Sequence, residues 1–397
     1  MAGRELTPQQ QKAVAKLRRL KVGALFCECG TGKTQMAATL ANEVKKCDSV
    51  VWVCPLRTAD NLRKELDECG LEKPVTIYGI ESIGQSDRVY MEAVATLEKA
   101  KHAFLICDES LKIKNGIAKR TRRMMELAKR SEFRLILNGT PVSRNILDLY
   151  HQMRFLSPRI LDMTWAAYRR RYCVTKDIKR PYKRPITVVT GYANVDNLLS
   201  VVGPYVYECR LNLSLAKRYE TRHWYMSVEE RNAYIDLKNE LLDAYADDYG
   251  EVQIVAILAK LHHAYCCCED KFDRVAEIGP DERTIIFCRF VRAAAECQRR
   301  FPKALVLTYG KGAFGLNLQR CNRVVFFDKT WDYAFREQSE ARIYRNGQQN
   351  DCEYYDLTGD VGMEELFDRC IDKKVRLVEY IKANGAEIIE NLRKEKK

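Results

Sequence analysis

One stretch near the amino end constrains the fold more than any other. Residues 27–34 read Cys-Glu-Cys-Gly-Thr-Gly-Lys-Thr, between an apolar run from Val22 to Phe26 and apolar residues at helical spacing. Glycines in such a strand-to-helix turn let several backbone N–H groups face inward, and the helix N-terminus adds partial positive charge. The sequence therefore predicts an α/β fold with a phosphate-binding loop.

The residues of this loop have separate expected roles. Lys33 is expected to reach the β- and γ-phosphates of ATP, and the Thr34 hydroxyl to hold Mg²⁺. Cys27 stands where the usual motif G-x-x-x-x-G-K-[ST] has its first glycine. A glycine-rich helix cap with a solvated lysine is the alternative, and the strand–loop–helix context favours the ATP site. The ATP-binding residues predicted here are Gly30, Thr31, Gly32, Lys33 and Thr34.

A glutamine lies shortly before the loop. Thr7 and Pro8 open a helical pattern, with Thr7 as the cap and Pro8 at the first helical position. Gln10 in this helix can read the adenine edge through paired hydrogen bonds, so it is predicted to contact ATP. A solvated helix start is the alternative.

Two carboxylates end another buried strand. The apolar run 103–107 leads directly into Asp108 and Glu109, and ligands collect at the carboxyl ends of strands in open α/β sheets. Asp108 is predicted to hold Mg²⁺ through water, and Glu109 to orient or deprotonate the attacking water. A solvated turn is the alternative. Arg57 and Thr58 follow the strand 50–54 and are expected at the same edge of the sheet.

Composition limits the class of protein. A net charge of +13 favours a polyanionic partner, and no run approaches the roughly 18 apolar residues of a membrane span. The 16 cysteines are scattered without paired C-x-x-C motifs, which favours a reducing compartment over a metal site. The N-terminus lacks the apolar core of a signal peptide. The prediction is a cytoplasmic protein with no membrane association.

The second half of the chain predicts another α/β lobe, with strands at 284–288, 304–308, 323–328 and 353–357. The segment before it is helical and irregular, and its basic, aromatic block 168–184 suits either phosphate contact or a solvated charged face. Arg342 and Arg345 are three apart, so a helix would place both on one face. This lobe has no phosphate loop, so the two arginines are predicted to reach the nucleotide of the first lobe; surface ion pairs are the alternative.

Together these motifs resemble those of the Snf-type (SWI/SNF-like) DNA translocase ATPases of helicase superfamily two. Residues 108–115 look like the family's D-E-x-H-x-I-K-N segment, and residues 137–141 with Asn145 look like its T-G-T-P-x-x-N. Residues 315–318 and 337–348 match its fifth and sixth helicase motifs, and residues 225–234 look like the segment before its second lobe.

The resemblance implies two RecA-like parallel-sheet lobes with a helical insertion between them, divided as 1–155, 156–222 and 223–397. It implies that Gly315 and Gln338 contact the nucleotide and that Arg342 and Arg345 complete the catalytic site. The nucleic-acid contacts expected are Arg57, Thr58, Lys114, Arg289, Lys311 and Asn317. Three features depart from the family: Ser110-Leu111 after the Asp-Glu pair, Asn138, and a spacing of only about 20 residues between two strands of the second lobe. The short spacing implies that this lobe is either trimmed or partly missing.

The expected function is an ATP- and Mg²⁺-dependent motor that moves along DNA, with duplex DNA favoured, in a monomer from a prokaryote or phage. One alternative is a helicase that separates strands of DNA or RNA. The other is a binding module that uses ATP only to switch its grip on DNA or on a protein partner.

Overall fold

The computed structural model describes residues 5–139, 146–180, 183–244, 250–312, 318–372 and 377–394. The chain divides into two compact units, Met1–Asn212 (unit 1) and Leu213–Lys397 (unit 2). Each unit is built on its own parallel sheet, which confirms the predicted fold class. The three-part division of the chain stays a prediction.

The sheet of unit 1 has six parallel strands in the order β3-β2-β4-β5-β1-β8. Helices cover both faces of this sheet, so its inner strands are continuous apolar runs, and every residue of β4 is buried. The strands are β1 (Val22–Cys27), β2 (Ser49–Cys54), β3 (Val75–Gly79), β4 (Ala103–Cys107), β5 (Phe133–Asn138) and β8 (Val206–Cys209).

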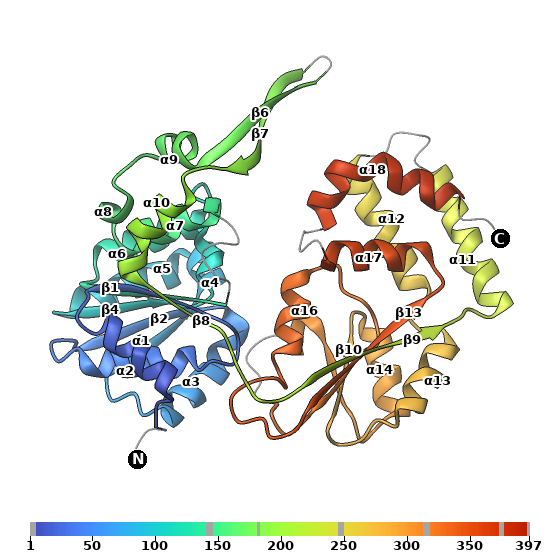
Figure 1. Cartoon of the computed structure of the whole chain (residues 1–397), viewed down its shortest axis with the longest axis horizontal. Coiled ribbons are helices and arrows are strands. Elements are labelled where there is room, and N and C mark those ends of the chain that lie inside the picture. Colours follow the sequence, from blue (N-terminus) through green and yellow to red (C-terminus); the bar gives the residue numbers. More distant parts are fainter. Residues whose placement is uncertain are drawn as a thin grey trace. The chain divides into compact units, whose positions relative to one another are not determined.

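Two sets of helices cover the two faces of this sheet (Figure 1). Alternate residues of each strand face opposite cores: Leu105 of β4 packs with the second set of helices and Ile106 with the first. The first set is α1 (Pro8–Leu17), α2 (Lys33–Glu43) and α3 (Ala59–Glu68), the last preceded by the short turn η1 (Leu56–Thr58). The second set is α4 (Ile80–Gln85), α5 (Asp87–Lys99), α6 (Lys119–Lys129) and α7 (Ile146–Leu156), with η2 (Ser110–Ile113) before α6.

The segment after α7 differs from the predicted helical insertion. It contains an antiparallel two-stranded ribbon, β6 (Cys173–Arg180) and β7 (Lys183–Tyr192), which projects from the helices around it (Figure 1). Ile178 pairs with Ile186, and β-branched residues of this kind favour extended backbone over helix. The helices on either side are α8 (Pro158–Leu161), α9 (Trp165–Tyr172), α10 (Val195–Val202) and η4 (Gly203–Tyr205).

The sheet of unit 2 has five parallel strands in the order β11-β10-β12-β13-β9. The four predicted strands are all present. The edge strand β9 was not predicted, because its residues are mostly polar and do not show the alternation of polar and apolar residues that indicates a strand. A single helix, α14 (Val291–Arg300), joins β10 to its neighbour β11, as the short spacing implied. The strands are β9 (Lys217–Trp224), β10 (Thr284–Cys288), β11 (Leu305–Thr308), β12 (Arg323–Phe326) and β13 (Cys352–Gly359).

The helices of unit 2 pack mainly into one large apolar cluster. They are α11 (Val228–Asp243), α12 (Glu251–Ala264), α13 (Glu269–Ile278), α14, α15 (Tyr309–Gly312), α16 (Tyr333–Glu340), α17 (Gly362–Asp372) and α18 (Leu377–Lys394). Across the described parts of both units, every helix is too short or too polar to cross a bilayer.

Candidate nucleotide site

The predicted phosphate loop joins the end of β1 to the start of α2. Gly30 and Gly32 have φ angles of 85° and 81°, in the left-handed region that favours glycine. A side chain at Gly32 would be strained by the positive φ, and its Cβ would also displace the Gln10 amide from the loop. The two glycines therefore set the shape of the loop.

Lys33 is the first residue of α2 and bends back over the loop. Its Nζ donates hydrogen bonds to the carbonyl oxygens of Cys27 at 2.8 Å and Glu28 at 3.2 Å. Burial alone would lower the pKa of Lys33, but the acidic groups of Cys29, Glu109 and Asp108 outweigh it and raise the pKa. The ammonium group is thus charged and held over the loop, where a phosphate would replace the carbonyls.

Asp108 and Glu109 lie directly beyond β4, at the same edge of the sheet. The Asp108 N–H donates to the carbonyl of Val53 at 2.7 Å, and the Glu109 N–H donates to Oδ1 of Asp108 at 2.8 Å. Glu109 has a φ of 48°, an uncommon conformation for a residue with a side chain and typical of functional sites. Burial, and then the charge of Glu109, raise the pKa of Asp108 to about 7, against the opposing charge of Lys33.

The donor set suits a hard dication. Within the described ranges, no cluster of three or more His, Cys, Asp or Glu side chains is placed to hold a metal alone. Mg²⁺ in nucleotide sites takes one or two protein oxygens, with phosphates and water supplying the rest. Thr34, the second residue of α2, and Asp108 would be those ligands. A dication there would also offset the repulsion that raises the pKa of Asp108.

Gln10 is buried against the loop and uses both ends of its amide. Its Oε1 accepts from the Thr7 N–H at 2.9 Å, and its Nε2 donates to the carbonyl of Thr31 at 2.9 Å. The first contact belongs to the capping box of α1, so Gln10 connects the start of this helix to the phosphate loop. The spacing of Thr7 and Gln10 could have indicated the capping box, whereas adenine contact stays a prediction.

The loop is also bonded to the chain that leaves unit 1. The Glu28 N–H donates to the carbonyl of Cys209, the last residue of β8, at 3.0 Å. The Glu28 carboxylate accepts from the Leu211 N–H at 3.0 Å, and Gln9 donates to the carbonyl of Arg210 at 3.1 Å. The sequence analysis missed these contacts, because they join residues about 180 to 200 positions apart.

The nucleic-acid contacts predicted in unit 1 have different surroundings. Arg57 is exposed in η1. The Thr58 hydroxyl donates to the carbonyl of Pro55 at 2.8 Å, and Lys114 forms a 2.8 Å ion pair with Asp148. Thr58 and Lys114 therefore also have local structural roles. Ser110, one of the departures from the family pattern, is buried and donates to Gln152 at 2.6 Å.

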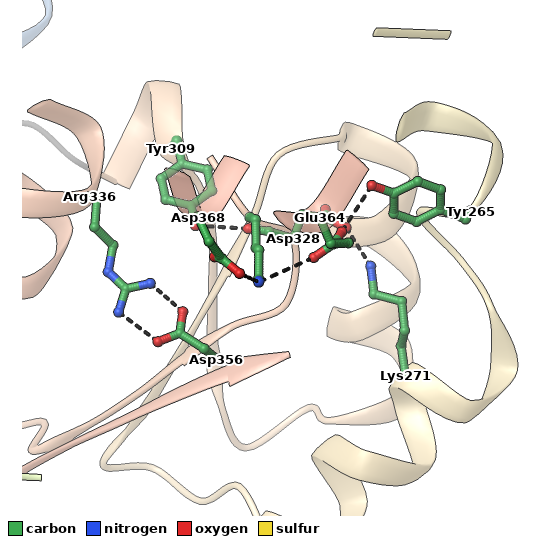
Figure 2. Close-up of polar contacts among 9 residues, drawn as sticks. Tyr265, Lys271, Tyr309, Asp328, Arg336, Asp356, Glu364 and Asp368 are labelled. Carbon is green, nitrogen blue, oxygen red and sulfur yellow. Dashed lines mark hydrogen bonds and ion pairs between the residues drawn. The ribbon is translucent and has the colours of Figure 1, made fainter. Parts of the chain in front are cut away.

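In unit 2, the carboxyl end of the sheet carries a buried ionic network (Figure 2). Lys271 and Asp328 form a 2.6 Å ion pair in which neither side chain is more than 1% exposed. Asp328 also accepts from the Arg289 N–H at 2.9 Å, and the Tyr309 hydroxyl donates to the Asp328 carbonyl at 2.8 Å. Each of these polar groups thus has a partner within unit 2.

The network continues along α17. Lys329 pairs with Asp368 at 2.6 Å and with Glu364 at 3.6 Å, and the Tyr265 hydroxyl donates to Glu364 at 2.9 Å. Burial raises the pKa of Glu364 to about 7. In the same view, Arg336 of α16 makes a two-pronged contact with Asp356 of β13 (Figure 2).

The expectation that a helix carries both Arg342 and Arg345 is wrong. Helix α16 ends at Glu340, and both arginines lie in the turns that follow. Gln348 fixes these turns: its Nε2 donates to the carbonyls of Cys321 at 2.8 Å and Ile343 at 3.1 Å, and its Oε1 accepts two backbone N–H groups. These local contacts, with the glycine at 347 (φ 96°), favour turns over a continued helix.

The other predicted contacts in unit 2 are spread over several elements. Gln338 is half-buried on α16, and its Oε1 has no hydrogen-bond partner among the described residues. The Arg289 guanidinium stacks on the Trp331 ring at 3.4 Å. Lys311 belongs to α15. Gly315 and Asn317 lie outside the described residues, as does the motif segment 140–145.

The structure thus brings one predicted set together in unit 1, and places Gln338, Arg342 and Arg345 on adjoining segments of unit 2. The set in unit 1 comprises Gln10, Gly30, Thr31, Gly32, Lys33, Thr34, Asp108 and Glu109.

Comparison with known proteins finds relatives named for DNA repair and for ATP-dependent helicase activity. The DNA repair and recombination protein RDH54 of Saccharomyces cerevisiae (strain AWRI1631) is 20% identical over 428 residues, covering 83% of this chain and 45% of RDH54. The ATP-dependent helicase fft1 of Schizosaccharomyces pombe is 20% identical over 425 residues, covering 83% and 44%. The chain spans less than half the length of these curated relatives.

Among solved structures, the Sulfolobus solfataricus SWI2/SNF2 ATPase core in complex with dsDNA is 19% identical, with a TM-score of 0.46 over 98% of this chain and 95% of that one. The family profile described as the SNF2-related domain matches residues 47–272, more than half of the chain. The chain therefore belongs to the SNF2-related family, the ATPases of helicase superfamily two that the motifs resemble.

Proposed function

We propose that this chain is an ATP-hydrolysing motor that nucleic acid stimulates and that moves along DNA, with duplex DNA as the favoured track. The observation that carries the proposal is the meeting of Lys33, Asp108 and Glu109 at one edge of the unit 1 sheet. A charged lysine over a glycine-shaped loop binds phosphate, and two carboxylates beside it serve the metal and the attacking water.

Each group has a defined task in this proposal. The β- and γ-phosphates displace the Cys27 and Glu28 carbonyls from Lys33. Glu109 accepts a hydrogen bond from the attacking water and orients it, or takes its proton, as it adds to the γ-phosphorus. Thr34 and Asp108 would hold Mg²⁺, which would supply positive charge to neutralise the phosphate oxygens.

The remaining roles in this proposal belong to residues of unit 2. Arg342 and Arg345 stabilise the negative charge on the transferring phosphoryl group, and Gln338 contacts the nucleotide with its unpartnered Oε1. Supply of these arginines by a separate unit would couple hydrolysis to closing and reopening of the two units, and so to steps along the track.

DNA is the proposed partner for two reasons. The curated relatives include a protein named for DNA repair and recombination. The chain also carries a net charge of +13, which favours phosphate backbones over other surfaces.

Strand separation is the second candidate, because the β6–β7 ribbon projects from unit 1 (Figure 1). A helicase needs an element of this kind to hold the separated strands apart. Release of a labelled strand from a partial duplex, with ATP, would assign strand separation. Displacement of a bound triplex strand without duplex melting would assign movement along intact duplex.

The first test is the steady-state ATPase rate of wild type and Glu109→Gln, measured without nucleic acid and with duplex DNA, single-stranded DNA and RNA. We expect the strongest stimulation by duplex DNA, and a loss of about 10²- to 10⁴-fold in Glu109→Gln, which keeps the shape but not the basicity of the side chain. Glu68→Gln, at an exposed position of α3, is the matched control and should behave as wild type. High basal turnover that ignores every nucleic acid would instead assign an ATP-operated switch.

A further inference from the structure

A cavity of about 670 Å³ runs along α6 in unit 1. Its walls come from α6, the start of β5, and residues of α7 and α8. Six of its lining residues are lysine or arginine and only one, Glu126, is acidic. The cavity therefore has a strongly positive lining, which the phosphate loop does not explain.

The cavity is separate from the nucleotide site. Arg134, in its floor, is the second residue of β5 and pairs in register with Val22, the first residue of β1. The phosphate loop begins after Cys27, five residues further along β1, which is about 16 Å at the usual strand rise. Arg134 thus lies at the opposite end of the sheet from the loop, and from there the cavity extends along α6 as far as Lys119.

Half of the basic residues are already neutralised. Lys119 pairs with Asp87 at 3.1 Å, Arg123 also contacts Asp87, and Lys129 pairs with Glu126 at 2.6 Å. These three side chains have their counter-ions within the protein, so they need none from a ligand.

The other three are arginines without a carboxylate. Arg122 on α6 and Arg154 on α7 are exposed, and in the described part of the chain neither forms an ion pair. Among the described residues, Arg154 donates a hydrogen bond to the hydroxyl of Tyr150 at 3.1 Å and lies over the ring of the same residue. Arg134 donates one hydrogen bond to the carbonyl of Ala128, at 3.2 Å, and burial lowers its pKa. A partly buried guanidinium without a counter-ion is costly and favours binding of an anion.

Unsatisfied polar atoms mark the same cavity. Thr121 is only 1% exposed, and its hydroxyl has no hydrogen-bond partner among the described residues. The Nε of Arg134 and the Nδ1 of His151 are also buried without partners there. Buried polar atoms without a hydrogen-bond partner are rare in folded proteins. These three atoms are closed to solvent, so a bound anion would be held by the exposed guanidinium groups of the cavity and drawn by the charge of Arg134.

We propose that this cavity binds backbone phosphates of a nucleic acid, as a second contact apart from the ATP-dependent one. Arg122 and Arg154 grip the phosphates with their exposed guanidinium groups, and the half-buried charge of Arg134 attracts the same phosphates. Arginine suits this task because its planar fork matches phosphate oxygens in pairs. The inference rests on the proposed function, since it assumes that the partner of the motor is a nucleic acid.

The test compares Arg122→Gln/Arg154→Gln with Arg18→Gln/Arg19→Gln in the full chain. The control removes the same two charges from exposed positions at the end of α1, on the opposite face of the sheet. Anisotropy of fluorescein-labelled duplex DNA, without ATP, gives the binding constant over a series of NaCl concentrations. Circular dichroism confirms that each variant is folded.

Each lost phosphate contact lowers the slope of log K against log[NaCl] by about 1. We expect the cavity variant to lose about 2 from this slope and the control to match wild type. ATP turnover without DNA should stay within about twofold of wild type in both. An equal loss in both variants, or none in the cavity variant, would overturn the inference and leave the motor function standing. If wild type neither bound DNA nor changed its ATP turnover when DNA was added, the proposed function itself would be refuted.

Two further arms identify the anion. Sodium phosphate, at the same ionic strength as chloride, should compete with DNA in wild type and less in the cavity variant. If phosphate raises the melting temperature of wild type alone while DNA binding is the same in both, the cavity holds free phosphate and the backbone assignment fails. Polyglutamate could bind wild type more tightly than DNA does and lose this advantage in the cavity variant. That result would identify an acidic polypeptide as the ligand and overturn the proposal.

Discussion

Both sheets collect charged residues at their carboxyl ends, but the two ends differ in how the charges are satisfied. In unit 1, Lys33 contacts backbone carbonyls and lies near two carboxylates that repel each other. In unit 2, Lys271 and Asp328 are fully buried and bind each other (Figure 2). The same topological position thus holds the proposed ligand site in one unit and a closed ionic network in the other.

The difference lies in what each lysine loses when a ligand arrives. Lys33 can exchange two carbonyl contacts for phosphate oxygens at little cost. Lys271 would have to leave a desolvated carboxylate behind, which is strongly unfavourable. We therefore interpret the network of unit 2 as the support that fixes β12, α13 and α17, and not as a second binding site.

The largest expected effect is on stability. Lys271→Met should destabilise unit 2 by about 3–5 kcal/mol, because it leaves the charge of Asp328 buried and unpaired. Lys33→Met should abolish ATP turnover while changing stability far less. Urea denaturation followed by circular dichroism measures the change in stability of each variant, and steady-state assays measure the change in ATP turnover.

A double variant checks the cause. Lys271→Met/Asp328→Asn removes both charges and keeps an acceptor for the Arg289 N–H, so it should regain most of the lost stability. If Lys33→Met proved as destabilising as Lys271→Met, the contrast between the two units would fail.

The next effect concerns the pH dependence of stability. The pKa of Glu364 in the folded chain is about 7, above its usual value of 4.5, so the folded state binds the proton more tightly than the unfolded state. Stability from this group is complete below about pH 4.5 and is lost as the pH rises through 7, at up to about 1.4 kcal/mol per pH unit. Denaturation of wild type and Glu364→Gln between pH 5 and 8 measures this slope. An unchanged slope in the variant would contradict the assignment.

Asp108 has a similar pKa, of about 7, but should affect ligand binding. Protonated Asp108 cannot hold Mg²⁺, so the apparent Mg²⁺ affinity should fall as the pH drops below about 7, by up to tenfold per unit. Mg²⁺ titrations of ATP turnover at pH 6, 7 and 8 test this. Asp108→Asn should lose the dependence and Glu364→Gln should keep it; the reverse pattern would exchange the roles given to the two carboxyl groups.

The smallest effect separates two helix caps. Thr7 of α1 and Ser227 of α11 each form a capping box, and alanine at either should cost about 0.5–2 kcal/mol. Only Thr7→Ala should also raise the KM for ATP, because Gln10 links that cap to the phosphate loop. Thermal melts and ATP titrations measure both; an equal rise in KM for Ser227→Ala would show that the link is not specific.

The sequence was most informative where local order determines structure. The glycines at 30 and 32 permit the left-handed backbone of the loop, and an apolar run followed by Asp108 and Glu109 favours a strand that ends in carboxylates. Parallel topology then brings these ends to one edge, so the set in unit 1 could be predicted.

The sequence was least informative where the structure depends on contacts between residues far apart in the chain. Lys271 and Glu364 lie on helices with strong amphipathic patterns and look like surface residues. In the structure each side chain is buried and paired with residues far away in the sequence, which local spacing cannot reveal. The turns at Arg342 and Arg345 depend on Gln348 reaching Cys321, 27 residues away. The ribbon at 173–192 was missed because charges and prolines interrupt its β-branched residues.

The contacts of Glu28 have a mechanical consequence. The backbone that connects one unit to the other departs from β8 at Cys209, and its first residues are bonded to the phosphate loop and to Gln9. A ligand that reshapes the loop must therefore shift or release the origin of the covalent link to the other unit. The covalent link between the units therefore begins beside the loop that we propose binds ATP.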